Sequence, residues 1–327
     1  LARDKMADLA QKHARDLVNL PPAELYPETL AQAALRLDAL PNVTVEVLDA
    51  AACRERGLVG IVAVGQGSDR EPCLIHVSYQ PPDPKDTVAL VGKGVTFDSG
   101  GYSLKPTDAM QTMRCDMGGA ATVLAAMGAI AEMGLPVRVE AFMPAVENLV
   151  SGGAYKLGDI LRYNNGVTVE IHNTDAEGRL ILADALILAG QIPGVSRIVD
   201  LATLTGAVII AIGSDYTGLF TSDDTIAGEL SAAAAANGEL MWRLPLHGAY
   251  NRMLKGTWSQ IKNVGGREAG SITAALFLEH FVPKGVKWAH LDIAGTAFAD
   301  APIEPYAAGG TGQVVRTLVS WVESLGG

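Results

Sequence analysis

Apolar runs of strand length alternate with longer helical patterns along almost the whole of this 327-residue chain. The run Thr87–Val91 is compact and apolar, which is typical of a strand at the centre of a sheet. A long segment of small residues follows and ends at Met133, and Val137–Pro144 then has the composition of another strand. Strands that alternate with helices in this way predict an α/β fold in which helices cover both faces of a sheet.

The length allows about two domains, but the sequence offers only one plausible boundary. Pro81, Pro82 and Pro84 form a stiff link, and predicted strands lie too close on both sides of it for separate domains. Residues 1–20 form an amphipathic pattern that Pro21 and Pro22 end. We therefore expect a single domain over residues 1–327, entered through a helical segment over residues 1–40.

Charge and composition exclude several classes of partner. The net charge is −11 and no basic run occurs, so a nucleic-acid backbone is not expected as the main partner. Charged residues make up only 19% of the chain, which favours a surface partly covered by subunit contacts. No apolar run reaches the length of a membrane span, and no signal peptide is apparent. Three widely spaced cysteines are typical of a reduced, cytoplasmic protein.

The segment Asn173–Leu180 concentrates charge between two apolar elements. Two carboxylates and a guanidinium, those of Asp175, Glu177 and Arg179, lie two residues apart in turn. In an extended segment, side chains at this spacing point to one side, so the three would line one pocket. The alternative is a solvated turn with an N-capping aspartate and a surface ion pair.

Other carboxylates also follow apolar strands, which raises the question of a metal site. If Asp98, Asp116, Asp175 and Glu177 converge, their charges need cations, and two bridged divalent metals would supply them. Oxygen ligands suit Mn²⁺, Mg²⁺ or Zn²⁺. Lys93 follows a strand directly, and its amine binds a metal only when neutral.

Several other catalytic patterns are missing. The six histidines form no H-E-x-x-H pair, and His172 is interpreted as structural. Neither a G-x-S-x-G motif nor a phosphate-binding glycine pattern occurs, although the loop after Val91 is rich in glycine. These absences argue against a serine hydrolase and against a nucleotide site.

The sequence resembles the catalytic domain of the leucyl aminopeptidase family, dinuclear metallopeptidases that include bacterial leucyl aminopeptidases and peptidase B. The segment Asn-Thr-Asp-Ala-Glu-Gly-Arg-Leu at 173–180 is highly specific to that family. The resemblance implies a mixed, mostly parallel central sheet flanked by helices, and one aminopeptidase catalytic domain without the family's N-terminal domain. The matching segments are Val91–Thr107, Asp116–Thr122, Val150–Ile160, Asn173–Leu180, Asp200–Ala207, Asn263–Glu279 and Trp288–Ala299.

The same resemblance implies two divalent metal ions per subunit, with Mn²⁺ or Zn²⁺ as first candidates and Mg²⁺ or Co²⁺ as further ones. Lys105 and Arg179 would be catalytic without binding metal, and a bicarbonate is expected near Arg179. A water that bridges the metals would attack the first peptide bond. The metal ligands implied are Lys93, Asp98, Asp116 and Glu177 for the tighter ion, and Asp98, Asp175 and Glu177 for the more exchangeable one.

The expected substrates are peptides with a free N-terminus that begin with leucine or another large residue. Ala297 stands where some relatives have a bulkier methionine, so the pocket is expected to be roomy. The family assembles as a homohexamer, a dimer of trimers, in the cytoplasm. The substrate-binding residues implied are Met113, Thr203, Leu204, Gly206, Ala294 and Ala297.

Two other functions are alternatives to that of a peptidase. A two-metal phosphoesterase or nuclease uses similar carboxylates, but the acidic net charge and a lysine at a ligand position disfavour it. A non-catalytic binding or DNA-architectural role requires a basic groove, and the sequence predicts none.

Overall fold

The computed structural model describes residues 2–302, 304 and 306–327. Within them, nine strands form the main sheet, in the order β1-β2-β5-β3-β8-β12-β9-β10, with β4 paired to β5. Their bounds are β1 Val43–Leu48, β2 Cys73–Tyr79, β3 Thr87–Gly92, β4 Gly94–Asp98, β5 Arg138–Asn148, β8 Arg197–Ala202, β9 Tyr216–Phe220, β10 Leu240–Arg243 and β12 Lys287–Asp292.

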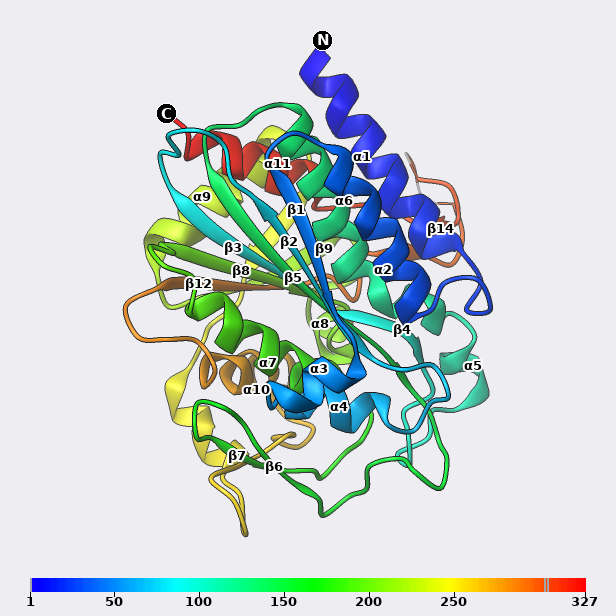
Figure 1. Cartoon of the computed structure of the whole chain (residues 1–327). Coiled ribbons are helices and arrows are strands. Elements are labelled where there is room, and N and C mark those ends of the chain that lie inside the picture. The colour runs from blue at the N-terminus through cyan, green and yellow to red at the C-terminus, as the bar shows by residue number, and fades with distance from the viewer. Residues whose placement is uncertain (1, 303, 305) are drawn as a thin grey trace.

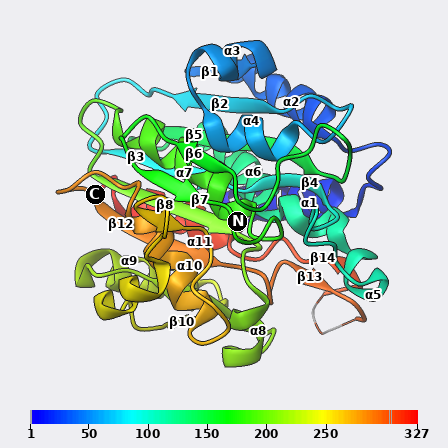
Figure 2. The ribbon, with the colours of Figure 1, turned by 90° about the horizontal axis from the view of Figure 1, so that it is seen from below.

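The four central strands β5, β3, β8 and β12 run parallel. Antiparallel pairs join β1 to β2, β2 to β5 and β12 to β9, so the sheet is mixed and mostly parallel, as expected. The strands β1 and β10 lie at opposite sides of the molecule (Figure 2). Because the carboxyl ends of parallel strands meet at one edge, the loops after β3, β5, β8 and β12 gather there.

The alternation of side chains along β3 separates two cores. Val88 and Leu90 pack into one apolar cluster, whereas Ala89 and Val91 pack into the other. Both clusters are buried, so β3 is apolar on both faces, as central parallel strands are. Thr87–Val91 was predicted as such a strand, and that prediction is confirmed.

Helices cover both faces of the sheet (Figure 1). One layer holds α1 (Ala2–Asn19), α2 (Pro27–Leu35), α6 (Gly118–Glu132), α9 (Asp224–Ala236) and α11 (Val315–Ser324). The other holds α3 (Ala50–Glu55), α4 (Val59–Gly65), α7 (Gly178–Gly190) and α10 (Gly270–Glu279). The predicted α/β architecture is therefore confirmed, although Leu1 of the first predicted helix lies outside the described residues. None of the described helices is long and apolar enough to cross a membrane.

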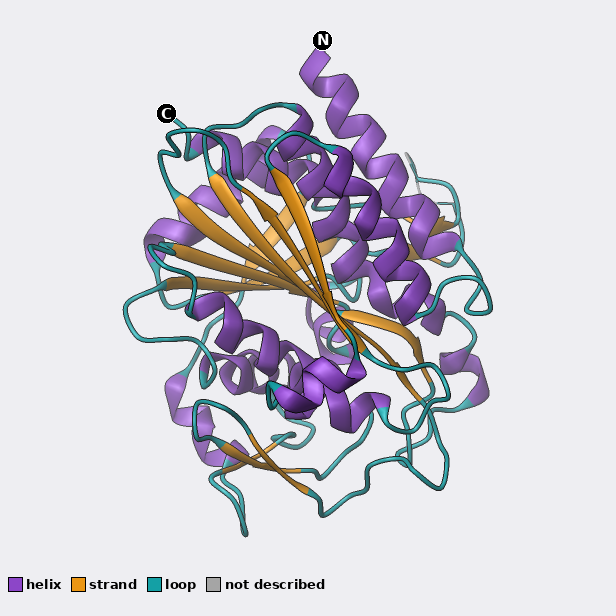
Figure 3. Ribbon diagram, viewed as in Figure 1, coloured by secondary structure: helices purple, strands orange, loops and turns teal. Residues whose placement is uncertain are grey.

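A small second sheet lies apart from the main one (Figure 3). It contains a hairpin, β6 (Ile160–Arg162) and β7 (Thr168–Glu170), with β11 (Ile261–Lys262) parallel to β7. The remaining elements are α5 (Thr107–Met110), α8 (Gly206–Ile212), β13 (Phe298–Ala299), β14 (Gly309–Gly310) and the 3-10 helices η1 (Arg36–Ala39), η2 (Met113–Met117) and η3 (Gly248–Leu254).

Two element boundaries differ from the sequence predictions. The strand expected to end at Pro144 continues to Asn148 as β5. The loop expected after Val91 contains β4, which pairs with the extended part of β5 from Ala145 onwards. Both differences have one cause, because β4 and the extended part of β5 form hydrogen bonds with each other.

Candidate metal centre

The predicted ligands gather at the carboxyl edge of the central strands. Lys93 follows β3, and its backbone is fixed by bonds from its N–H to the oxygen of Leu201 (3.0 Å) and from the N–H of Ala120 to its own oxygen (2.8 Å). Asp98 ends β4, and Asp116 lies in η2. The four parallel strands thus bring segments far apart in sequence to one place.

The segment that contains Asp175 and Glu177 is not extended, contrary to the sequence prediction. Thr174 and Asp175 form a turn, and Arg179 already lies in the first turn of α7. The three charged side chains nevertheless line one pocket. The pocket was predicted correctly, but the spacing argument behind it was wrong.

Three carboxylates form the centre of the cluster. Asp98, Asp175 and Glu177 each offer an oxygen, and these atoms lie within 4.8 Å of one another. Asp98 and Glu177 are only 2% and 1% exposed. The side chain of Asp175 is 33% exposed and so reaches the open side of the cluster.

Two lysines lie between these carboxylates. The Nζ atom of Lys93 is 2.8 Å from Oδ1 of Asp116 and 2.9 Å from Oε1 of Glu177. The Nζ atom of Lys105 is 2.9 Å from Oδ2 of Asp98 and 2.6 Å from Oδ1 of Asp175. Each lysine therefore joins two carboxylates that come from different segments of the chain.

Close packing allows Lys93 to reach the cluster. A Cβ atom added to Gly178 would lie 2.7 Å from Cε and 2.8 Å from Nζ of Lys93. A side chain at this first residue of α7 would displace the end of the Lys93 side chain, so glycine leaves the space that the ammonium group occupies. The Asn173–Leu180 motif thus supplies space as well as charge.

The pKa values show how crowded the cluster is. Burial, together with the charges of Asp98 and Glu177, raises the pKa of Asp175 to about 6. Burial also raises the pKa of Glu177 and of Asp116. Burial alone would lower the pKa of Lys93, but Asp116 and Glu177 raise it above its ordinary value. The cluster therefore favours any added cation.

The residues fit divalent metal ions. Oδ2 of Asp116 and Oε2 of Glu177 are buried and have no hydrogen-bond partner among the described residues. Buried carboxylate oxygens without partners are costly unless a cation or a donor meets them. A hydroxyl group already orients Asp116, because Oγ1 of Thr203 donates to its Oδ1 at 2.7 Å.

Arg179 is buried beside the cluster without joining it. Its Nη1 atom donates to the backbone oxygen of Asn263 at 2.8 Å, and its Nε atom has no partner among the described residues. No ion pair with Glu177 was found in the described part of the chain, although that pair was the alternative interpretation. Burial lowers the pKa of Arg179 to about 10. The guanidinium is thus charged at neutral pH and retains a free donor.

The cluster opens into a pocket of about 670 Å³. Five of the predicted substrate-binding residues line it: Met113, Thr203, Leu204, Gly206 and Ala294. Ala297 is buried and is not among the lining residues; it lies behind Gly118, whose added Cβ atom would be 3.3 Å from that of Ala297. Apolar residues of α8, Ile209 and Ile210, also line the pocket and carry no local sequence signal for that role.

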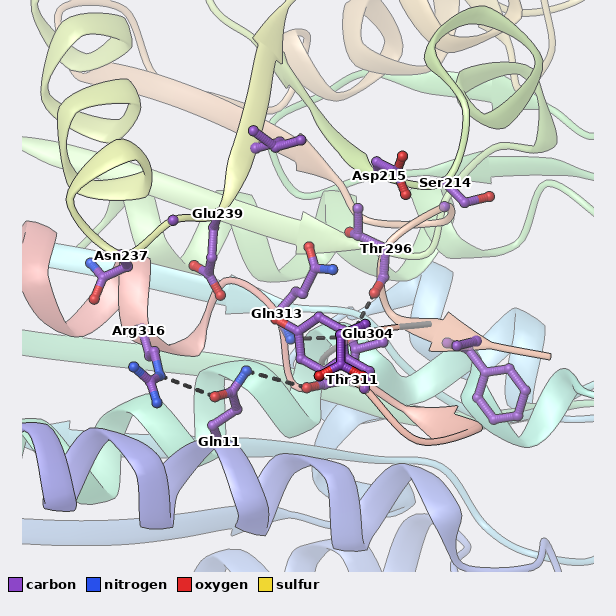
Figure 4. A pocket seen from close by; sticks show the side chains of 16 residues that line it. Gln11, Ser214, Asp215, Asn237, Glu239, Thr296, Glu304, Thr311, Gln313 and Arg316 are labelled. Atoms are coloured by element: carbon purple, nitrogen blue, oxygen red, sulfur yellow. Dashed lines mark hydrogen bonds between the residues drawn. The ribbon is translucent and has the colours of Figure 1, made fainter. Parts of the chain in front are cut away.

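A second pocket, of about 520 Å³, is lined in part by residues of the turn after β12 (Figure 4). Gly295 and Thr296 line it, whereas Ala294 lines the metal-site pocket. Its side chains bond to one another: Arg316 Nε donates to Gln11 Oε1 at 3.0 Å, and Gln11 Nε2 donates to the oxygen of Thr311. No residue of the metal cluster lines this pocket.

Comparisons with known proteins agree with this geometry. The sequence model of the cytosol aminopeptidase family, catalytic domain, matches residues 12–319. A "Probable cytosol aminopeptidase" from Synechococcus sp. (strain CC9311) is 49% identical over 94% of this chain and 63% of its own length. A protein with the same name from Chlorobaculum tepidum is 48% identical over 94% of this chain and 61% of its own length.

The chain therefore spans less than two thirds of the length of these relatives. Among solved structures, "Bottromycin maturation enzyme BotP in complex with Mn" is 43% identical, with a TM-score of 0.96. That match covers all of this chain and 72% of the other.

Proposed function

The chain belongs to the cytosol aminopeptidase family, and from this premise we propose that it is the catalytic domain of a metal-dependent aminopeptidase. It would release leucine and other large residues from the N-terminus of peptides. The observation that carries the proposal is the group of three carboxylates, Asp98, Asp175 and Glu177, with oxygens within 4.8 Å of one another. Carboxylates held this close together, two of them almost fully buried, need cations to balance their charges.

Two divalent ions per subunit are proposed. Mn²⁺ is the first candidate because a solved relative is described as a complex with Mn, and Zn²⁺, Mg²⁺ and Co²⁺ are the others. Bound ions would supply a Lewis acid for the scissile carbonyl and a water of lowered pKa. The proposed ligands are Lys93, Asp98, Asp116, Asp175 and Glu177.

Lys105 and Arg179 would act without binding metal. The side chain of Lys105 is 15% exposed and lies in the pocket, so its ammonium group is placed to donate to an oxygen that gains negative charge. Arg179 keeps Nε free while Nη1 is held by Asn263. That free donor favours a small anion, and bicarbonate is the proposed one because it also accepts a proton.

The pocket accounts for the proposed substrates. Negative charge at its base attracts the α-ammonium group of a peptide, and the apolar residues Met113 and Ile209 provide a surface for a large first side chain. Ala294 adds little bulk, so several large residues would be accepted. Lining by Ala297 remains a prediction from resemblance.

Assembly, location and domain content are also proposals. The small share of charged residues is compatible with subunit contacts, and the family resemblance implies a homohexamer made of two trimers. The names of the relatives support a cytoplasmic location. Residues 1–327 would form one catalytic domain, because β2 and β3, on either side of the proline link, belong to the same sheet.

A pair of substrates tests the proposed function. With Mn²⁺ present, the protein is expected to hydrolyse leucine p-nitroanilide but not its N-acetylated form, because acetylation removes the charge that the pocket selects. A panel of aminoacyl amides then tests the roomy pocket. Equal hydrolysis of both anilides would refute an aminopeptidase, and strict preference for leucine would refute the roomy pocket alone.

A further inference from the structure

Two buried asparagines hold the turn that contains Asp175 from different sides. Asn148 is the last residue of β5, and Asn263 follows β11. Both side chains are completely buried. Neither residue was predicted to belong to the site, and neither is charged.

Asn148 bonds to both metal-binding segments at once. Its Nδ2 atom donates to Oδ1 of Asp98 at 2.8 Å and to the backbone oxygen of Thr174 at 2.9 Å. Its own backbone oxygen accepts from the N–H and the hydroxyl group of Ser99, at 3.0 and 2.7 Å. The amide of Asn148 thus holds the carboxylate of Asp98 and keeps it close to the backbone of Thr174, the residue before Asp175.

Asn263 bonds to the same turn but to no carboxylate. Its Oδ1 atom accepts from the N–H groups of His172 (2.8 Å) and Asn173 (3.3 Å), and its Nδ2 atom donates to the oxygen of Asn173 at 2.6 Å. Its backbone oxygen accepts from Nη1 of Arg179. The side chain therefore locks the position of a carbonyl group that holds the guanidinium.

An amide suits both positions better than a charged group. At Asn148 a carboxylate would repel Asp98, and a lysine would compete with a metal ion for the same oxygen. At Asn263 the side chain needs one donor and one acceptor to bond to both backbone groups of Asn173, and an amide offers them on two separate atoms without charge.

We infer that Asn148 and Asn263 are positioning residues with separate tasks. Asn148 orients Asp98 and thereby sets the affinity of the site for divalent cations. Asn263 orients Arg179 and thereby sets the rate of the catalysed step. The second task rests on the proposed aminopeptidase function, whereas the first does not.

Three variants separate these tasks. Asn148→Leu keeps the branched shape of the side chain in a somewhat larger volume but removes both donated bonds. Asn263→Leu removes the bonds that the Asn263 amide donates and accepts. Tyr155→Phe is the matched control, because the hydroxyl group of Tyr155 donates to the same oxygen of Thr174 (2.7 Å) without contacting Asp98. Calorimetry on metal-free protein measures the Mn²⁺ affinity of each variant. Hydrolysis of leucine p-nitroanilide gives kcat and KM, and the temperature of thermal unfolding shows whether the variant is folded.

We expect Asn148→Leu to bind Mn²⁺ about 10- to 100-fold more weakly, since loss of partners of metal ligands costs that much. Asn263→Leu is expected to keep the affinity for Mn²⁺ and to lose about 10- to 100-fold in kcat at unchanged KM. Tyr155→Phe is expected to change neither value. Asn148→Ala and Asn263→Ala repeat the comparison in smaller side chains if a leucine variant does not fold.

Several results would overturn the inference. If Asn148→Leu bound Mn²⁺ as tightly as the parent protein, or if Tyr155→Phe weakened binding equally, Asn148 would only hold the turn. If Asn263→Leu lost Mn²⁺ binding together with activity, the two tasks would not be separate. A parent protein that binds Mn²⁺ without hydrolysing the anilide would instead refute the proposed function and leave the task of Asn148 standing.

Discussion

Two clusters of buried charge in this protein differ in what they leave unsatisfied. In one, Asp200 on β8 lies opposite His290 on β12, with Oδ1 of the carboxylate 2.6 Å from Nδ1 of the imidazole. Oδ2 of Asp200 accepts from the indole Nε1 of Trp288 at 2.7 Å. Both carboxylate oxygens therefore have partners, and only Nε2 of His290 has none among the described residues.

The metal cluster also buries charged side chains but is not closed. Asp116 and Glu177 each keep one buried oxygen without a partner in the described part of the chain, and both residues line a pocket of about 670 Å³. A raised pKa occurs in both clusters, since Asp200 raises the pKa of His290 even though burial opposes it. Burial and a shifted pKa thus do not by themselves distinguish a ligand site from a structural cluster. The metal cluster differs from the closed one by its unpartnered carboxylate oxygens beside a cavity.

The largest expected effect comes from removing one of those oxygens. Glu177→Ala should abolish Mn²⁺ binding and lower kcat/KM by about 1,000-fold or more, because the central carboxylate of the cluster is lost. Calorimetry and the anilide assay measure both effects. Glu177→Gln, which keeps the shape, serves as the folding control, and a metal-loaded, active Glu177→Ala protein would show that the open oxygens do not form the site.

The next largest effect is expected at Arg179, whose charge lies beside the carboxylate cluster and not within it. Arg179→Ala should lower kcat by about 100- to 1,000-fold and leave Mn²⁺ affinity unchanged, because Arg179 provides a donor but is not in contact with the carboxylates. Arg179→Lys keeps the charge without the planar donor set and should not restore kcat. Loss of Mn²⁺ from both variants would mean that Arg179 supports the metal ligands instead.

A change in the closed cluster should affect stability alone. Asp200→Asn presents an N–H group to either Trp288 or His290, which both donate to the carboxylate, so one buried donor loses its acceptor. We expect the free energy of unfolding to fall by about 2 kcal/mol, measured by urea denaturation. Unchanged stability combined with weaker Mn²⁺ binding would contradict the distinction between the two clusters.

The smallest expected effect is the pH dependence of metal binding. The pKa of Asp175 is raised to about 6, so the carboxylate holds a proton below that pH and has lost it above. Mn²⁺ affinity should therefore fall by about tenfold for each pH unit below 6 from this group alone, as calorimetry between pH 5 and 7 can show. Affinity that is constant over this range would mean that Asp175 does not bind the ion.

Residues at strand ends could be predicted from the sequence, and residues held by distant pairing could not. Asp98 ends β4, and Asp175 and Glu177 follow β7, so the apolar runs before them indicate their positions, whereas Asp116 lies in η2. The sequence does not indicate Asn148, because Pro144, which cannot donate to a ladder, is the expected end of its strand. The strand continues because β4 pairs with it from Ala145 onwards, and that pairing is long-range.

Asn263 shows a second limit of sequence analysis. It bonds to Asn173, 90 residues earlier in the chain, and nothing in its neighbourhood distinguishes it from a turn residue. The extended geometry predicted for residues 175–179 was wrong for a related reason. The local spacing suggested a strand, whereas α7 begins at Gly178, next to Lys93.

The central claim is that the open cluster holds divalent metals for peptide hydrolysis. Its most direct test uses metal-stripped protein with two substrates, leucine p-nitroanilide and bis-p-nitrophenyl phosphate, before and after Mn²⁺, Zn²⁺ or Mg²⁺ is added. We predict that the stripped protein is inactive and that added metal restores cleavage of the anilide only. Anilide cleavage without metal, or metal-dependent cleavage of the phosphodiester in its place, would contradict the account.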